Sequence, residues 1–232
     1  METPQGTLHP LTLVMNDMVR IFEGLGFSVA TGPEMEDEWH NFDALNVPAG
    51  HPARDMQDTF WIRGEQGKLL RTHTSPVQIR YMENHDITQR PVAIICPGKV
   101  FRNEATDATH EMQFHQMEGL LVGENISIAH LKGVLLEFFK QFVGPDTDIR
   151  LRPSFFPFVE PGLEVDVKMG DKWVEVLGAG LVNPVVLKNV GFDPQKVSGF
   201  AFGMGIDRLA TLKFGVPDVR LYYQGDVRLN QF

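Results

Sequence analysis

The chain has 232 residues, of which 43% are hydrophobic, a single cysteine, and a formal net charge of −9 at pH 7. This length and apolar content suffice for a full core, so a single domain over residues 1–232 is expected. The acidic balance disfavours generic nucleic-acid binding by a basic surface, whereas a local RNA contact is compatible with it. One cysteine excludes an internal disulfide, and no segment has the pattern of a signal peptide or a membrane span, so a cytoplasmic protein with no membrane partner is expected.

Apolar periodicity predicts a helix near the start of the chain. Leu11, Val14 and Met18 follow a spacing of three and four, with Pro10 in the first turn and Gly24 at the end. This helix and the strand after it fit either core packing or an interface with a partner. The other elements expected in the first hundred residues are a strand at 27–31, a helix at 34–46, strands at 59–62 and 69–71, a helix from Ser75 to about residue 84 and a strand at 92–96.

Three residues around these elements have alternative interpretations. Ser75 is the predicted N-cap of its helix, because Pro76 follows in the first turn. His73 is either a loop histidine or a residue that faces a ligand from the end of a strand. Cys96 ends an apolar run and is expected to be a buried thiol rather than a nucleophile.

Residues 98–119, GKVFRNEATDATHEMQFHQMEG, carry the densest polar pattern of the chain. Residues 99–102 and 112–122 predict two antiparallel strands, with a long loop at 103–111 between them. We therefore expect a strand–loop–strand unit in this part of the chain.

One face of this unit carries a distinctive set of side chains. Phe114, Gln116 and Glu118 alternate along the second strand and therefore share a face, and Arg102 lies near the end of the first strand. An aromatic ring, an amide, a carboxylate and a guanidinium suit a small ligand that has a flat ring, an ammonium and a phosphate. The alternative interpretation is a solvated hairpin with one polar face.

The second half of the chain predicts one helix and then a glycine-rich antiparallel meander. The helix is expected at 125–142 with Ser127 as its cap, and a further helix opens at Ile206 and carries Arg208. The expected strands lie at 149–152, 163–167, 172–177, 178–180 and 199–205. The last two are rich in small residues, which let a ligand approach the backbone closely. The spacing supports neither a P-loop nor a Rossmann fingerprint, and no Cys/His cluster has zinc spacing.

Phe156 and Phe158 flank a proline and are expected on one face of their segment. They fit either the core or an apolar box for an aromatic ligand.

Several of these segments together closely resemble the catalytic module of bacterial phenylalanyl-tRNA synthetase alpha subunits. The segments are NFDALN with HPAR and DTFW, RTHTSPVQIR, GKVFRNEATDATHEMQFHQMEG, FFPFVEPGLEVDV and SGFAFGMGIDRLATL. The resemblance covers nearly the whole chain and implies the α+β catalytic fold of class II aminoacyl-tRNA synthetases, a mainly antiparallel sheet flanked by helices. It places the three class II motifs at about residues 9–34, 98–122 and 199–213.

The resemblance implies that ATP activates L-phenylalanine to phenylalanyl-adenylate, by attack of the carboxylate on the α-phosphate, for transfer to tRNA(Phe). Arg102 is implied as the catalytic residue that binds both reacting groups. The implied ATP-binding residues are Arg102, Glu104, His110, Phe114 and Arg208, with adenine stacked between Phe114 and Arg208. The implied phenylalanine-binding residues are Trp61, His73, Ser75, Gln116, Glu118, Phe156, Phe158 and Ala201, the last setting which para substituents fit. Glu160 resembles a ligand of Mg²⁺.

The resemblance also implies partners. The family works with a beta subunit, so the surface of the first motif is expected to contact that subunit or a second copy of this chain. Family members usually carry a helical tRNA-binding arm before His9, which is expected to be absent here. Contact with tRNA(Phe) is then weak, and efficient charging by this chain alone is not expected. Asp207 and Asn183 stand where the family commonly has Glu and His.

The alternative function is that of a non-catalytic relative or accessory subunit that binds phenylalanine or an adenylate. The presence of both Arg102 and Arg208 favours the enzyme, because a pure binder need not keep both phosphate-holding arginines. Another adenylate-forming ligase of this fold is disfavoured by the pair of Phe156 and Phe158.

Overall fold

The computed structural model describes residues 6–51, 54, 59–89 and 91–230. Its strands are β1 (Ser28–Val29), β2 (Met35–Asp37), β3 (Lys68–Leu70), β4 (Val92–Phe101), β5 (Gln113–Gly123), β6 (Ile149–Phe156), β7 (Val159–Met169), β8 (Lys172–Val182) and β9 (Ser198–Gly205). Its α-helices are α1 (Pro10–Gly24), α2 (Glu38–Asn41), α4 (Ser75–Glu83), α5 (Ile128–Phe142), α6 (Pro184–Asn189) and α7 (Ile206–Phe214). Three 3₁₀ turns are η1 (Asp43–Leu45), η2 (Val219–Tyr223) and η3 (Val227–Asn230).

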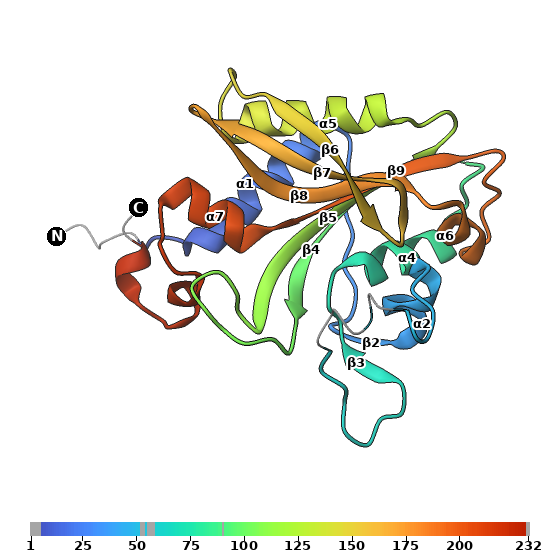
Figure 1. Ribbon diagram of the computed structural model, residues 1–232, viewed down its shortest axis with the longest axis horizontal. Helices are drawn as coiled ribbons and strands as arrows, with labels where there is room; N and C mark the ends of the chain where they lie inside the picture. The colour runs from blue at the N-terminus through green and yellow to red at the C-terminus, as the bar shows by residue number, and fades with distance from the viewer. Residues whose placement is uncertain (1–5, 52–53, 55–58, 90, 231–232) are drawn as a thin grey trace.

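Seven strands form one sheet in the order β1-β4-β5-β9-β8-β7-β6, and β2 pairs with β3 in a separate small sheet (Figure 1). Only β1 runs parallel to its neighbour β4, and the other pairs of the large sheet are antiparallel. The predicted α+β class with a mainly antiparallel sheet flanked by helices is therefore confirmed.

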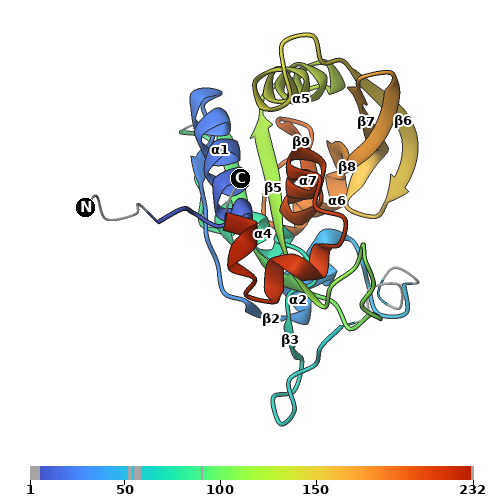
Figure 2. The ribbon, with the colours of Figure 1, turned by 90° about the vertical axis from the view of Figure 1, so that its left-hand side faces the viewer.

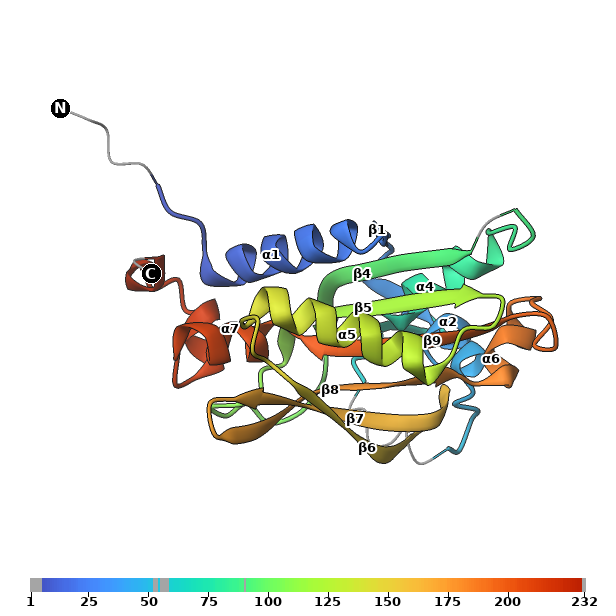
Figure 3. The same ribbon diagram turned by 90° about the horizontal axis from the view of Figure 1, so that it is seen from above.

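The two faces of the large sheet are covered differently. Ile95 and Met117 pack with α1, α5 and α7 in one apolar cluster, and α1 and α5 run across that face (Figures 2 and 3). Ile94, Cys96 and Leu120 point the other way and pack with residues of α4, α6 and η1. Because successive side chains of a strand alternate between faces, the two clusters lie on opposite faces of the sheet. The second cluster covers only one end of its face, which leaves room for a cavity beside it.

Several expected elements are confirmed by the structure. The first helix, the helix after residue 75, the helix capped by Ser127 and the meander of β6, β7 and β8 all form. The strands expected at 92–96 and 99–102 are one continuous strand, β4. Cys96 is buried, as expected. No helix among the described residues has the length and apolarity to cross a membrane.

The helix expected at 34–46 is wrong over most of its length. Residues Met35–Asp37 instead form β2 and pair with β3, and only four residues make α2 before the η1 turn. The buried carboxylate of Glu36 accepts hydrogen bonds of 2.9 and 2.5 Å from Arg80. This tertiary contact and the pairing of β2 outweigh the local preference for helix, because propensity is a weak prior.

Two further expectations are corrected. The strand expected at 59–62 reduces to a single bridge between Trp61 and Leu69. Thr74, rather than Ser75, is the N-cap residue of α4, and the Ser75 hydroxyl is free to bond elsewhere.

Asn183 caps α6, since its side chain accepts a hydrogen bond of 2.9 Å from the N–H of Val185.

Candidate active site

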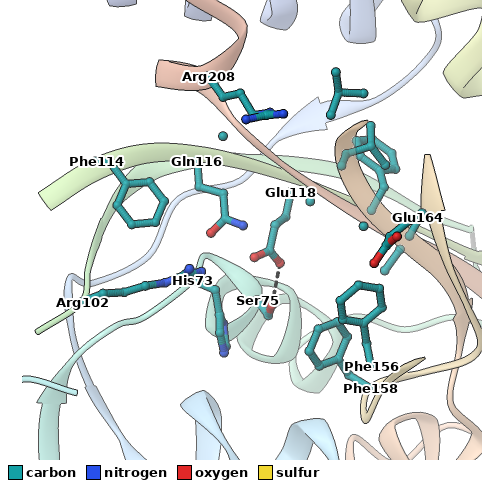
Figure 4. A pocket seen from close by; sticks show the side chains of 18 of the residues that line it. His73, Ser75, Arg102, Phe114, Gln116, Glu118, Phe156, Phe158, Glu164 and Arg208 are labelled. Carbon is teal, nitrogen blue, oxygen red and sulfur yellow. Dashed lines mark hydrogen bonds between the residues drawn. The ribbon is translucent and has the colours of Figure 1, made fainter. Parts of the chain in front are cut away.

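A cavity of about 1120 Å³ opens on the face of the sheet that carries Leu120. Phe114, Gln116 and Glu118 lie in its floor on β5, as their alternation predicted (Figure 4). Phe114 and Arg208 lie at one end of the cavity, and Phe156 and Phe158 lie at the other. The cavity is thus elongated, with an amide and a carboxylate between two aromatic ends.

Glu118 is the buried carboxylate at the centre of the floor. It accepts hydrogen bonds from the Thr74 N–H at 3.1 Å, the Ser75 hydroxyl at 2.5 Å and the Gln78 amide at 3.0 Å. Thr74 is the N-cap of α4, and Ser75 and Gln78 lie in its first turn, where a negative charge is also stabilised by the helix dipole. Burial raises the pKa of Glu118 to about 7, against the lowering effect of Ser75 and Thr74. A cationic partner in the cavity would therefore convert this group to a carboxylate at neutral pH.

Three residues that line the cavity each have a buried polar atom with no hydrogen-bond partner among the described residues. The atoms are Oε1 of Gln116, Nδ1 of His73 and Oγ1 of Thr211. Burial, followed by the charges of Arg102 and Arg71, lowers the pKa of His73 to about 3, so its imidazole is neutral. An unsatisfied buried acceptor is costly, and such groups in a cavity indicate where a ligand donates a hydrogen bond.

Arg102 lies beside this centre. Its Nε donates to the carbonyl oxygen of Thr72 at 3.2 Å, and its guanidinium lies 5.0 Å from the centroid of the Phe114 ring. Burial lowers its pKa, although Glu104 and Glu118 act in the opposite direction. Within the described part of the chain Arg102 forms no salt bridge, so its positive charge remains available to an anionic ligand.

Asn41 holds the backbone that supports Arg102. Its amide donates to Oγ1 of Thr72 at 3.1 Å, and its Oδ1 accepts from the Thr72 N–H at 3.2 Å. Both residues are buried, and the two hydrogen bonds hold the segment between β3 and α4 in place beside the cavity.

The loop after β4 closes one side of the cavity with Glu104 and His110. Nδ1 of His110 lies 3.0 Å from both carboxylate oxygens of Asp107, and the Asp107 N–H donates to the His110 carbonyl at 3.0 Å. Hydrogen bonds from Thr109 and His110 lower the pKa of Asp107. These bonds give the loop tip a defined turn that presents His110 to the open side of the cavity.

Arg208 extends from the first turn of α7. Its Nε and Nη2 donate to the carbonyl oxygen of Glu175 at 3.0 and 2.8 Å, and its side chain is exposed. Phe114 lies at the same end of the cavity, as the expected pair of adenine-stacking residues requires (Figure 4).

The opposite end is apolar. The rings of Phe156 and Phe158 are 6.0 Å apart between centroids and inclined by 20°, and Ala201 also lines the cavity. Gly178 leaves room for this arrangement, because a Cβ there would lie 2.9 Å from the Phe156 ring. The expectation that both phenylalanines share a face is confirmed.

Two predicted site residues do not line the cavity. Trp61 is 52% exposed and pairs with Leu69 in the hairpin that projects away from the large sheet (Figure 1). Glu160 is exposed at the start of β7 and is likewise absent from the cavity wall. The predicted roles of these two residues remain predictions.

The predicted Mg²⁺ ligand, Glu160, does not line this cavity, and its role as a metal ligand stays a prediction. The described residues contain one cluster with metal-ligand spacing, Glu36, Asp37 and His40. That cluster lies outside the cavity and is engaged by Arg80 and Lys68.

Sequence reasoning missed several supporting residues. Gln78 lies three positions after Ser75 on one helix face, so helical spacing was a usable signal for its contact with Glu118. Asp207 accepts a hydrogen bond of 2.8 Å from the backbone N–H of His115 and one from the hydroxyl of Tyr223. No spacing in the sequence pointed to Tyr223, which is distant from these partners along the chain.

The combination of fold and cavity defines a class of enzyme. A mainly antiparallel sheet carries a strand–loop–strand unit with a buried arginine and an aromatic ring, and a glycine-rich strand leads into a helix with a second arginine. This is the arrangement of a class II aminoacyl-tRNA synthetase core.

Comparisons with known proteins agree with this class. The family model described as "tRNA synthetases class II core domain (F)" matches residues 1–232. The phenylalanine–tRNA ligase alpha subunit of Anoxybacillus flavithermus is 54% identical over 241 residues, which cover 98% of this chain and 69% of that protein. The corresponding subunit of Dehalococcoides mccartyi is 51% identical over 247 residues, covering 99% of this chain and 70% of its own length. The corresponding subunit of Trichlorobacter lovleyi is 54% identical over 241 residues, which cover 98% of this chain and 70% of that protein. The chain therefore belongs to the family of phenylalanine–tRNA ligase alpha subunits.

Proposed function

We propose that this chain activates L-phenylalanine with ATP to phenylalanyl-adenylate, the intermediate that passes its aminoacyl group to tRNA(Phe). The observation that carries the proposal is the unpaired Oε1 of Gln116 beside the buried carboxylate of Glu118, between an apolar aromatic end and Arg102. Such a site matches an amino acid with a flat apolar side chain, an ammonium and a carboxylate.

The amino acid is proposed to lie along the cavity floor. Its ring packs on Phe156 and Phe158, and its ammonium donates to Gln116 and Glu118. Its carboxylate then points toward the end of the cavity that carries Arg102. The aromatic end of the cavity excludes water from the ring, and burial of one phenyl ring contributes about 2–3 kcal/mol to binding. The apolar end rejects an added hydroxyl only weakly, so tyrosine is expected to enter to some degree.

ATP is proposed to lie at the other end, with adenine between Phe114 and Arg208 and its phosphates toward Glu104 and His110. A carboxylate oxygen of phenylalanine attacks the α-phosphorus in line, a new P–O bond forms, and the bond to pyrophosphate breaks. Arg102 binds the carboxylate and the α-phosphate together and neutralises the charge that develops on the equatorial oxygens. Orientation of the two substrates in one cavity supplies the remaining rate enhancement.

The edge of the sheet is proposed to contact a partner subunit. β1 is the first strand in the sheet order, and both of its residues are exposed. An exposed edge strand offers unpaired backbone groups to another chain. A beta subunit or a second copy of this chain is the proposed partner at this surface, and residues 1–232 are proposed to act as one catalytic domain.

Phenylalanine-dependent exchange of pyrophosphate into ATP tests the proposal directly. The chain is expected to catalyse exchange with phenylalanine and not with leucine. The alternative is a protein that binds phenylalanine without catalysis. Calorimetry that detects phenylalanine binding, together with exchange at background, would support that alternative. Folded protein that neither binds phenylalanine nor exchanges pyrophosphate would contradict both.

A further inference from the structure

The 3₁₀ turn η2 contacts two elements at the end of the cavity that carries Phe114 and Arg208. The Val219 N–H donates to the carbonyl oxygen of Ala108 in the loop after β4, at 3.0 Å. The hydroxyl of Tyr223 donates to Oδ1 of Asp207 at 2.5 Å, at the start of α7. Residues 219–223 therefore connect the loop of the strand–loop–strand unit with the helix that carries Arg208.

Asp207 continues the hydrogen-bonding ladder at the point where β9 ends. The last register pair between β5 and β9 is Gln116 with Gly205, after which the chain turns into α7. One residue before Gln116, the His115 N–H donates to Oδ2 of Asp207 at 2.8 Å. The side chain of Asp207 thus satisfies a backbone donor that the strand no longer reaches.

This hydrogen bond joins the immediate neighbours of the two stacking residues. His115 follows Phe114, and Asp207 precedes Arg208. The hydrogen bond between the Asp207 carboxylate and the His115 backbone therefore holds the backbone positions of Phe114 and Arg208 at a fixed separation, while the guanidinium of Arg208 is also held by the Glu175 carbonyl.

Tyr223 restricts rotation of the Asp207 carboxylate. Its hydroxyl donates to one carboxylate oxygen while lying 3.0 Å from Nδ1 of His115, and the His115 and Tyr223 ring planes differ by only 1°. Burial raises the pKa of Asp207 to about 6, and burial together with Asp207 raises the pKa of Tyr223. At neutral pH the phenol therefore stays protonated and donates to a carboxylate, which is the stronger kind of hydrogen bond.

We propose that Tyr223 is a positioning residue for the nucleotide, which holds Asp207 against the His115 backbone and thereby sets the gap between Phe114 and Arg208. The inference rests on the proposed activation of phenylalanine with ATP. It assigns to the C-terminal turn a role in affinity for the purine ring and none in the recognition of phenylalanine.

The test compares Tyr223→Phe with Tyr222→Phe in pyrophosphate exchange. Tyr222 is a buried neighbour in the same turn, and its hydroxyl makes no hydrogen bond to Asp207 or His115. Tyr223→Phe is expected to raise the KM for ATP about 5- to 20-fold, since one charge-assisted hydrogen bond is lost. The KM for phenylalanine and the melting temperature are expected to stay near those of Tyr222→Phe. Equal rises in both KM values, or a KM for ATP that matches the control, would overturn the proposal.

Amide hydrogen exchange of the ligand-free proteins supplies a readout that needs no catalysis. Peptides that contain His115 are expected to exchange faster in Tyr223→Phe than in wild type or Tyr222→Phe, because the acceptor of that N–H is less well held. Unchanged exchange at His115 would overturn the positioning role. If wild type itself catalyses no pyrophosphate exchange, the proposed function fails, while this measurement and ATP calorimetry still decide the role of Tyr223.

Discussion

The hydroxyl of Ser75 lies 2.5 Å from Oε2 of Glu118, which ties the first turn of α4 to the strand that forms the floor of the cavity. Thr74 and Gln78 donate to the same carboxylate, so the helix presents three donors to one buried group. A carboxylate held in this way has one orientation, and it can receive an ammonium without reorganising.

Removing this hydroxyl is expected to weaken binding of phenylalanine selectively. Ser75→Ala leaves Glu118 with two donors and raises its pKa further, because one of the groups that favour the carboxylate is gone. The KM for phenylalanine is expected to rise about 5- to 10-fold in pyrophosphate exchange, with little change in the KM for ATP. Ser198→Ala is the matched control, since its hydroxyl bonds to the carbonyl oxygen of Ile126 away from the cavity. A rise in the KM for ATP alone would contradict the assigned role.

The raised pKa of Glu118 makes stability depend on pH in a definite direction. Its pKa is about 7 in the folded chain, above the usual value of 4.5, so folding favours the protonated form. That contribution to the free energy of unfolding is complete below about pH 4.5 and is lost as the pH rises through about 7. Between pH 4.5 and pH 8 the free energy of unfolding should therefore fall by at most about 3 kcal/mol because of Glu118, and this fall should be absent in Glu118→Gln. Urea titrations of both proteins between pH 4.5 and 8 measure it. Parallel curves for the two proteins would show that Glu118 titrates normally.

Phenylalanine binding is expected to release a proton from Glu118. The ammonium of the ligand favours the carboxylate, whereas the free site is largely protonated below its pKa of about 7. Affinity should therefore rise about tenfold per pH unit as the pH increases toward 7 and level off above it. Calorimetry at pH 6 in two buffers of different ionisation enthalpy measures the released proton. Equal heats in the two buffers would argue against this coupling.

The size of Ala201 is expected to limit substituents on the phenylalanine ring. Ala201→Gly removes a methyl group from the cavity wall near the apolar end, and it should improve exchange with para-substituted phenylalanines relative to phenylalanine. Ala93→Gly on β4 is the control, because it removes the same group from a strand position outside the cavity. Unchanged selectivity in Ala201→Gly would show that Ala201 does not limit the ring.

Strand alternation predicted which side chains of β5 face the cavity. Phe114, Gln116 and Glu118 were placed on one face by a period of two along β5. Phe156 and Phe158 were also expected on one face, but Phe158 lies in the turn after β6, so strand alternation does not explain their pairing. Such periodicity fixes which side chains share a face. The resemblance supplied the arrangement of the two substrates, which no spacing in the chain defines.

The missed features depend on contacts between distant segments. The strand β2 formed where a helix was expected, because β3 pairs with it and Arg80 neutralises Glu36. Trp61 lies on the hairpin with Leu69 and is 52% exposed, and its predicted contact with phenylalanine stays a prediction. The contact of Tyr223 with Asp207 joins residues 16 positions apart through a turn of irregular backbone, which carries no periodic signal.

The central claim is that one cavity holds phenylalanine and ATP with Arg102 where they meet. Pyrophosphate exchange by wild type, Arg102→Ala and Arg63→Ala tests it most directly, since Arg63 is exposed on a turn outside the cavity. We predict phenylalanine-dependent exchange in wild type and Arg63→Ala, and a loss of at least about 100-fold in kcat/KM for Arg102→Ala with its fold intact. Exchange in Arg102→Ala at the wild-type rate would contradict the claim.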